Sequence, residues 1–204
     1  MDENYQRPIL SRYVDPYELV WLATARRLGL FIRRDPSIYS MTDGSGLLAL
    51  APRTDLDADD TLPQQVLHEV CHWMVNGLDT YEQRDWGYEL DVPLDDPREH
   101  ACLRLQCWLA DAHGLRGMLA NTGLYRPYYE SLSDPTVALD DSEAEGRVMA
   151  LFEAARARVQ QEPYWSALQA ALSATASFKA TLQPFLDDYA TEVDDDSLPS
   201  LWSR

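Results

Sequence analysis

Leu67-His68-Glu69-Val70-Cys71-His72-Trp73 is the stretch around which the rest of the chain is organised. Its two histidines stand four residues apart, so a helix of 3.6 residues per turn places both imidazoles on one face, one turn apart. Glu69 then lies about 100° around the helix from His68, where it can reach a metal-bound water without ligating the metal. The stretch therefore predicts an HExxH metal helix with His68 and His72 as ligands and Glu69 as general base.

The alternative is an amphipathic helix that carries two half-buried histidines by accident. Against it, the chain has only four histidines, and these two fall among apolar residues, where unpaired imidazoles are costly to bury. The boundaries of a helix are also marked. Thr61 and Gln64 form a capping box at its start, and Asn76-Gly77 is a typical end.

The third ligand is predicted in the helix that begins at Asp96-Pro97-Arg98-Glu99 and ends near Gly114. Glu99 follows His72 by 27 residues, in the first turn of a helix able to pack against the metal helix. His100 and His113 are rivals, and His100 points about 100° away from Glu99, so only one of that pair can face the metal. We favour Glu99, because two histidines and a carboxylate are a common open-site ligand set. Its alternative role is that of a helix-capping side chain.

The fold class expected from pattern and capping signals is α+β, mostly helical and zincin-like, with a small antiparallel sheet before the HExxH helix. At 204 residues, 46% of them hydrophobic, the chain suits one domain, assigned here to residues 1–190, followed by an acidic and flexible tail at 191–204. Strands are expected near 30–32, 37–41 and 47–51, with a hairpin around the glycines of 43–46. Helices are expected at 15–28, 61–76, 96–114, 142–161 and 164–180.

The net charge of −17 disfavours nucleic acid and anionic membranes as partners, because both carry negative charge. Solubility alone explains such a charge equally well. No apolar stretch approaches the length of a membrane span, and the first residues do not resemble a signal peptide. Three cysteines without a C-x-x-C pair favour a reducing compartment, so we expect a cytoplasmic protein.

The residues around the HExxH stretch also resemble a known family. His68-Glu69-x-x-His72-Trp73, Gly77, the block Asp85-x-Gly87-Tyr88, and Glu99 with Gly114 are similar in spacing to the signature of the elongation factor P hydroxylase family. The resemblance implies a metal-dependent enzyme that hydroxylates a modified lysine on a protein substrate, a translation factor. It implies His68, His72 and Glu99 as the metal ligands.

The ligand set itself serves two reactions, and the resemblance leads us to favour the hydroxylase over a metallopeptidase. With Fe(II) its vacant positions bind dioxygen for hydroxylation, and with Zn(II) they hold a water for attack on a peptide carbonyl. A peptidase also needs an oxyanion stabiliser, with Tyr88 or Tyr128 as candidates, and an edge strand, for which we considered 47–51. A binding protein without turnover is a third hypothesis.

Two further assignments stay open at the level of sequence. The aromatic run that contains Tyr125, Tyr128 and Tyr129 can supply a phenol to the site, although core packing is the commoner role of such residues. Asp85 is either a hydrogen-bond acceptor for a ligating imidazole or a loop-packing residue.

Overall fold

The computed structural model describes residues 10, 14–57, 59–88 and 93–190, and these form a mostly helical α+β fold. The predicted acidic tail at 191–204 lies outside the described residues. The longer elements follow one another as α1 (Pro16–Arg27), β1 (Phe31–Arg34), β2 (Ser40–Thr42), β3 (Leu47–Leu50), α2 (Leu62–Asn76), α3 (Pro97–Asp111), α4 (Arg126–Ser131), α5 (Glu143–Val159) and α6 (Tyr164–Ala190). Short 3-10 turns lie between them as η1 (Arg53–Asp55), η2 (Leu78–Thr80), η3 (Arg84–Gly87) and η4 (Gly123–Tyr125).

The helix starts lie where the capping residues predicted them. The Asp15 carboxylate accepts from the backbone N–H of Tyr17 at 2.8 Å, and the Asp96 carboxylate accepts from Arg98 at 2.8 Å. Thr61 and Gln64 form the predicted capping box of α2. These caps satisfy N–H groups that the first turn of a helix leaves without partners.

Helix α6 is longer than predicted. It continues to Ala190 with Pro184 inside it, whereas the sequence suggested an end near residue 180. Pro184 removes the helical hydrogen bond to the Ala180 carbonyl, and both residues are exposed.

The sheet differs from the prediction in one respect. Strands β2 and β3 form the predicted antiparallel hairpin, but β1 pairs in parallel with the other side of β3, which gives the order β1-β3-β2. The sheet is therefore mixed rather than antiparallel, and β3 is central instead of being an edge. The physical reason is the apolar run of β3, in which Leu48, Ala49 and Leu50 are fully buried and need cover on both faces.

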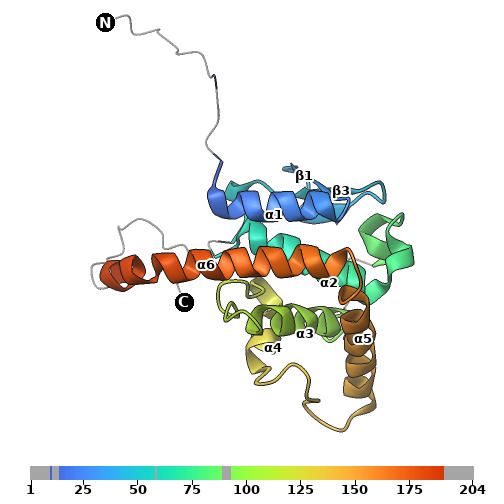
Figure 1. Cartoon of the computed structure of the whole chain (residues 1–204). Coiled ribbons are helices and arrows are strands. Elements are labelled where there is room, and N and C mark those ends of the chain that lie inside the picture. The colour runs from blue at the N-terminus through green and yellow to red at the C-terminus, as the bar shows by residue number, and fades with distance from the viewer. Residues whose placement is uncertain (1–9, 11–13, 58, 89–92, 191–204) are drawn as a thin grey trace, which may run out of the picture.

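The other helices are arranged around α2, the helix that carries His68 and His72 (Figure 1). Helix α1 lies next to the sheet, α6 runs across the middle of the molecule, and α3 and α4 lie below, with α5 upright at one side. Helix α2 contacts α1, α3 and α5, so nearly all of it is buried. The stretch that carries the histidines is thus the central element of the core.

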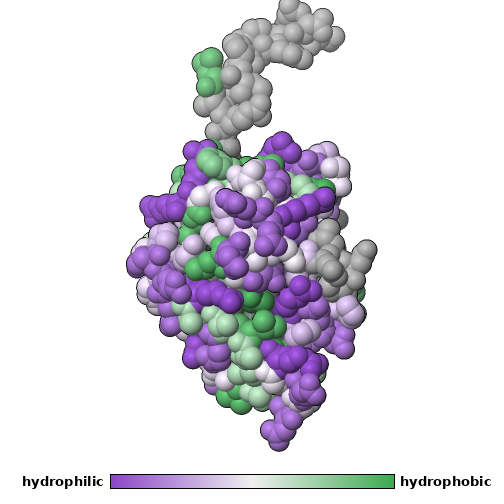
Figure 2. All heavy atoms as spheres, turned by 90° about the vertical axis from the view of Figure 1, so that its right-hand side faces the viewer, coloured by the Kyte–Doolittle hydropathy of each residue, from purple (hydrophilic) through white to green (hydrophobic). Residues whose placement is uncertain are grey.

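One face of the molecule is seen in a space-filling view. Figure 2 shows a face that is largely hydrophilic, with hydrophobic side chains gathered in smaller groups between the polar ones. Among the described residues, no helix combines the length and the apolar character that crossing a membrane requires.

Candidate metal centre

The three predicted ligands converge on one point. The Nε2 atoms of His68 and His72 lie 3.0 Å apart, on the same face of α2. The Glu99 carboxylate approaches them from the first turn of α3, with Oε2 at 3.2 Å from His72 Nε2 and Oε1 at 3.6 Å from His68 Nε2. Two elements separated by the 78–96 segment thus bring two nitrogens and one carboxylate together.

The separations fit a tetrahedral metal ion. Bonds of about 2.0–2.1 Å at tetrahedral angles place neighbouring ligand atoms about 3.3–3.4 Å apart. The observed separations of 3.0, 3.2 and 3.6 Å scatter around that value. The side chains of His68, His72 and Glu99 could therefore hold a metal ion at three corners of a tetrahedron.

Electrostatics also favour Glu99 as a candidate metal ligand. Its side chain is only 3% exposed. Burial alone would raise the pKa of its carboxyl group, but the neighbouring His72 and His68 hold that pKa at about 2. The pKa of His72 is lowered by burial, and Glu99 more than offsets this, so that the net shift is upward. A buried carboxylate that stays ionised is a suitable partner for a cation.

The second nitrogen of His68 is held by a residue that the sequence did not single out. His68 Nδ1 lies 2.9 Å from Gln106 Oε1, and the Gln106 amide nitrogen donates to the Leu119 carbonyl at 2.7 Å. Because the amide is oriented by Leu119, its oxygen faces the imidazole and accepts the Nδ1 proton. Nε2 is then the His68 nitrogen that faces His72 and Glu99. Gln106 follows Glu99 by seven residues, so helical periodicity was the signal that could have found it.

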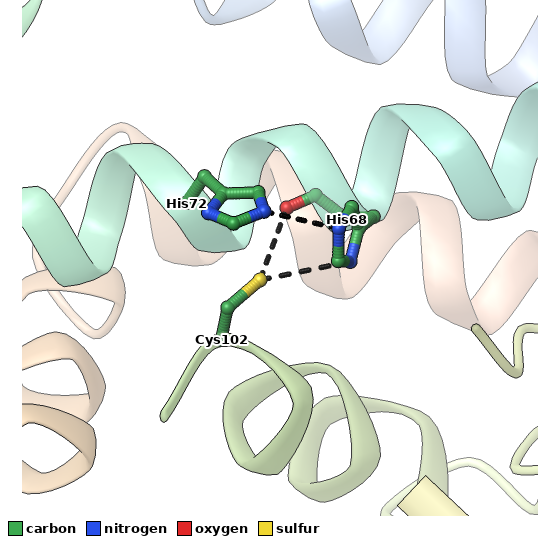
Figure 3. Close-up of side chains that lie close together, drawn as sticks. All are labelled: His68, His72 and Cys102. Carbon is green, nitrogen blue, oxygen red and sulfur yellow. Dashed lines mark hydrogen bonds between the residues drawn. The ribbon is translucent and has the colours of Figure 1, made fainter. Parts of the chain in front are cut away.

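Cys102 lies close to both histidines and is a further possible ligand (Figure 3). It comes from α3, and its sulfur is 3.6 Å from His68 Nδ1 and 3.5 Å from the His68 carbonyl oxygen. Burial raises the pKa of this thiol, so it is protonated at neutral pH. Nδ1 of His68 already faces Gln106. Cys102 therefore packs on the Nδ1 side of the imidazole, whereas Glu99 lies on its Nε2 side. All three cysteines are free and buried.

The rival histidines point elsewhere. His100 Nε2 lies 3.1 Å from the Leu94 carbonyl, and its ring stacks on Tyr128 at 3.7 Å. His113 Nε2 lies 3.1 Å from the Gln169 side chain on α6. Only Glu99 among the three candidates faces His68 and His72.

The predicted general base Glu69 is held from the sheet. The Ser40 hydroxyl donates to Glu69 Oε1 at 2.5 Å, which occupies one carboxylate oxygen. Glu69 lines the same cleft as the histidines. Ser40 lies 29 residues earlier in the chain, and no local pattern indicates its role.

Tyr88 lies at the site, as one of the two predicted phenols. Its ring centre is 4.9 Å from that of His72, and the Arg98 guanidinium lies over its other face at 4.6 Å. The Tyr88 hydroxyl is buried without a hydrogen-bond partner among the described residues. Burial raises the pKa of this phenol, so it remains a proton donor.

Of the three tyrosines at 125, 128 and 129, the fold brings only one to the cleft. Tyr125 lines the cleft, but Tyr128 accepts a hydrogen bond from Arg104 at 3.0 Å and does not line it. Tyr129 is buried and donates to the Arg116 carbonyl at 3.0 Å. Tyr128 therefore lies outside the cleft and cannot act as the oxyanion stabiliser.

The site opens into a cleft of about 580 Å³. Helix α2 forms its floor, residues 38–41 form one wall, and residues 121–125 form the other. Tyr39 and Thr122, one from each wall, donate to the buried carboxylate of Asp60. The two walls are thus tied together at one end of the cleft.

The wall at 38–41 belongs to an edge strand. The backbone groups of Tyr39 and Asp43 form hydrogen bonds directed towards the β3 strand. Met41, which lies between these two residues, pairs with Ala49 of β3. Because bonding alternates along an antiparallel pair, Ser40 and Thr42 direct their N–H and C=O groups away from β3. The edge next to the metal centre is therefore β2, whereas the sequence suggested residues 47–51.

Asp85 packs the loop and does not orient a histidine. Its Oδ1 accepts from the backbone N–H of Thr42 at 2.9 Å, and its Oδ2 lies 3.2 Å from Arg84 Nε. Asp85 and Trp86 both adopt positive φ angles, 49° and 55°, which non-glycine residues rarely do. Trp86 is buried and stacks on Trp73 of α2 with ring centres 5.2 Å apart. These contacts hold the segment that carries Tyr88 against the site.

Comparison with known proteins finds no match to this chain among protein-family models, curated proteins or solved structures. The resemblance to the elongation factor P hydroxylase family stays a prediction.

Proposed function

We propose that this protein is a zinc-dependent peptidase. The observation that carries the proposal is the convergence of His68, His72 and Glu99 beside Glu69, in a cleft bordered by the free edge of β2. Three protein ligands leave a position open, as in catalytic rather than structural zinc sites. The zincin-like assignment of the fold belongs to the same proposal.

The residues of the chain divide the work of hydrolysis. When bound, zinc supplies Lewis-acid chemistry and lowers the pKa of a coordinated water towards about 7. Glu69 is the group that takes the proton of the attacking water and later delivers it to the leaving amine. Ser40 leaves one carboxylate oxygen of Glu69 for this task. Tyr88, with a buried and unpaired hydroxyl, donates to the oxygen on which negative charge develops.

The edge strand supplies a means of holding the substrate. Ser40 offers an outward-facing N–H and C=O at the cleft, so an extended peptide can add to the sheet by backbone hydrogen bonds. At the next outward-facing position, the N–H of Thr42 already donates to the Asp85 carboxylate, so a substrate cannot use it. The free edge next to the site is thus short, and it suits a few residues around the bond to be cleaved.

Substitution of Glu69 by glutamine tests the proposal. Purified protein loaded with zinc should cleave members of a peptide library, and Glu69→Gln should lower kcat by about 10²–10⁴-fold, which is the typical contribution of a general base. Zinc content, measured by elemental analysis, should stay near one ion per chain, because Glu69 is not a ligand. The matched control is Glu82→Gln, which changes an exposed glutamate outside the cleft.

Two results would contradict the peptidase. Stoichiometric zinc without cleavage of any peptide, and with the same binding behaviour in Glu69→Gln, would favour the non-catalytic binding protein. Cleavage that survives in Glu69→Gln would remove the proposed base.

A hydroxylase remains the second candidate. Two histidines and one carboxylate on one face with open positions are also the ligand set of non-haem Fe(II) oxygenases. The cleft of about 580 Å³ can admit a side chain of a protein substrate such as a translation factor. Stoichiometric iron and oxygen consumption that depends on a protein substrate would favour it. We rank it second because oxygen chemistry uses neither a base at Glu69 nor a strand edge.

A further inference from the structure

Two buried side-chain amides line the cleft with hydrogen-bonding atoms that no described protein group uses. Gln65 is 5% exposed, and neither its Nε2 nor its Oε1 has a partner. Asn121 is 6% exposed, and its Oδ1 has none. Buried amides are normally paired, because leaving a donor or acceptor unsatisfied is costly.

Both amides lie on the same side of the metal centre. Gln65 precedes His68 by three residues, so it lies one helical turn before it on the same face of α2, away from His72. The amide nitrogen of Asn121 lies 3.4 Å from His68 Nδ1, the nitrogen that faces away from His72. Gln65 and Asn121 both line the cleft near His68, and we call them the amide pocket.

Neither amide is explained by structure alone. Gln64, the adjacent residue, completes the capping box of α2, but the side chain of Gln65 caps nothing. Gln106 lies equally deep in the protein, and both of its side-chain polar atoms are hydrogen-bonded. Gln65 differs from Gln106 in that neither of its side-chain polar atoms has a partner among the described residues, although it lines the cleft.

We propose that the amide pocket recognises a carboxamide side chain, asparagine or glutamine, of the peptide substrate. A primary amide offers both donors and an acceptor, so it pairs with Gln65 in two hydrogen bonds and with Asn121 in a third. Because Gln65 itself carries a donor and an acceptor, this pairing holds whichever way its amide is turned. This inference rests on the proposed peptidase function and names its substrate preference.

The position of the preferred residue follows from helix geometry. Three residues along α2 correspond to about 4.5 Å of axial rise, whereas an extended peptide advances about 3.3 Å per residue. The carboxamide therefore belongs to a residue within about two positions of the bond that is cleaved at the metal.

The test compares peptides that differ only in this side chain. For zinc-loaded protein, the ratio of kcat/KM between a glutamine or asparagine peptide and its methionine or leucine counterpart should be about tenfold, since a site built to hydrogen-bond a polar group discriminates against analogues that lack it. In Gln65→Met, which replaces the amide by an apolar group of similar shape, the ratio should fall close to one. Gln160→Met, at the exposed end of α5, is the matched control and should keep the wild-type ratio.

The same pair of peptides should be tested for binding without turnover. In zinc-loaded Glu69→Gln, the glutamine peptide should bind about tenfold more tightly than the methionine peptide, and the added Gln65→Met change should abolish the difference. If wild-type protein cleaves no peptide, the peptidase function fails, and the amide pocket is judged by this binding ratio alone. If peptides are cleaved without preference for a carboxamide, the amide pocket fails and the peptidase stands.

Two further outcomes would overturn the proposal. A uniform loss of kcat/KM for all peptides in Gln65→Met would mean that Gln65 binds the substrate main chain. A fall of several degrees in the Tm of Gln65→Met would mean that its amide has a structural partner, whereas we expect a Tm equal to or above that of the wild type.

Discussion

At the scale of single residues, the two imidazoles of the site are supported differently. His68 has its Nδ1 proton directed to Gln106, so the tautomer with a free Nε2 is selected. His72 Nδ1 is buried without a hydrogen-bond partner among the described residues. The orientation of His72 thus depends on packing against Tyr88 and on Glu99, and Gln106 is the support that mutation can test.

Replacing Gln106 by methionine should weaken metal binding. Loss of a hydrogen bond to a ligating histidine typically costs about 10–100-fold in affinity, and we expect a loss in this range for zinc in Gln106→Met. Competition with a chelating dye would measure it. The chain offers a matched control in Gln169, which makes the same kind of contact with His113 outside the cleft. An equal loss of affinity in Gln169→Met would contradict a local role of Gln106.

The identity of the third ligand can be tested at the same scale. We expect Glu99→Ala to lose stoichiometric zinc, because Glu99 faces the Nε2 atoms of both histidines. Cys102→Ala should retain it, because the thiol lies on the Nδ1 side of His68. Elemental analysis of the two dialysed variants distinguishes the roles. The opposite result, with zinc lost only in Cys102→Ala, would assign the sulfur as the ligand.

At the scale of elements, α3 joins the metal centre to the helical core. The face towards α2 carries Glu99, Cys102 and Gln106, while Arg104 points to the other side and is fully buried. The Arg104 guanidinium bonds to Glu145 of α5, to the Tyr128 hydroxyl and to two carbonyls at residues 135 and 137. Helix α3 is therefore fixed from behind by a fully paired buried charge.

Breaking the ion pair of Arg104 should cost much stability. Glu145→Ala leaves Arg104 buried without its counter-charge, and such changes typically destabilise by about 3–5 kcal/mol. Denaturant unfolding measures the difference. Glu143→Ala is the control, since its pair with Arg147 is exposed and such pairs contribute about 0.3–0.5 kcal/mol. Similar losses in both variants would show that burial does not decide the strength of these contacts.

At the scale of the whole molecule, the metal is expected to stabilise the fold. The ligands come from α2 and α3, so an ion that binds only the folded state links two central elements of the core. Binding at 100 times the dissociation constant adds about 2.7 kcal/mol to the free energy of unfolding. The expected effect thus spreads beyond the site to the cooperative unfolding of the protein.

Removal of the metal by a chelator should therefore lower the Tm. For a protein of this size, about 2.7 kcal/mol corresponds to a decrease of roughly 5–10 °C. Thermal unfolding followed by circular dichroism, with and without chelator, measures the decrease. His72→Ala should show no chelator effect, because it lacks one ligand. A wild-type Tm that is insensitive to both chelator and added zinc would remove the metal centre.

Short-range interactions explain what could be predicted from the sequence. The spacing of His68 and His72 and the caps at Asp15, Thr61 and Asp96 act within one or two helical turns, so residue types alone determine them. The α+β class and the hairpin at 43–46 follow from the same local patterns. Glu99 was favoured over His100 from residue chemistry, and the structure brings Glu99 to the two histidines.

Other features depend on how distant segments pack, which no local pattern determines. The position of β1 decided that β3 is central and that β2 borders the cleft. The crossing of α2 and α3 decided that Gln106 supports His68, and the fold of the 121–125 segment brought Asn121 beside it. The sequence by itself thus determined which residues can bind a metal, because helical periodicity is local. Only the tertiary structure decided which groups surround that site, because contacts between distant segments follow from packing of the whole core.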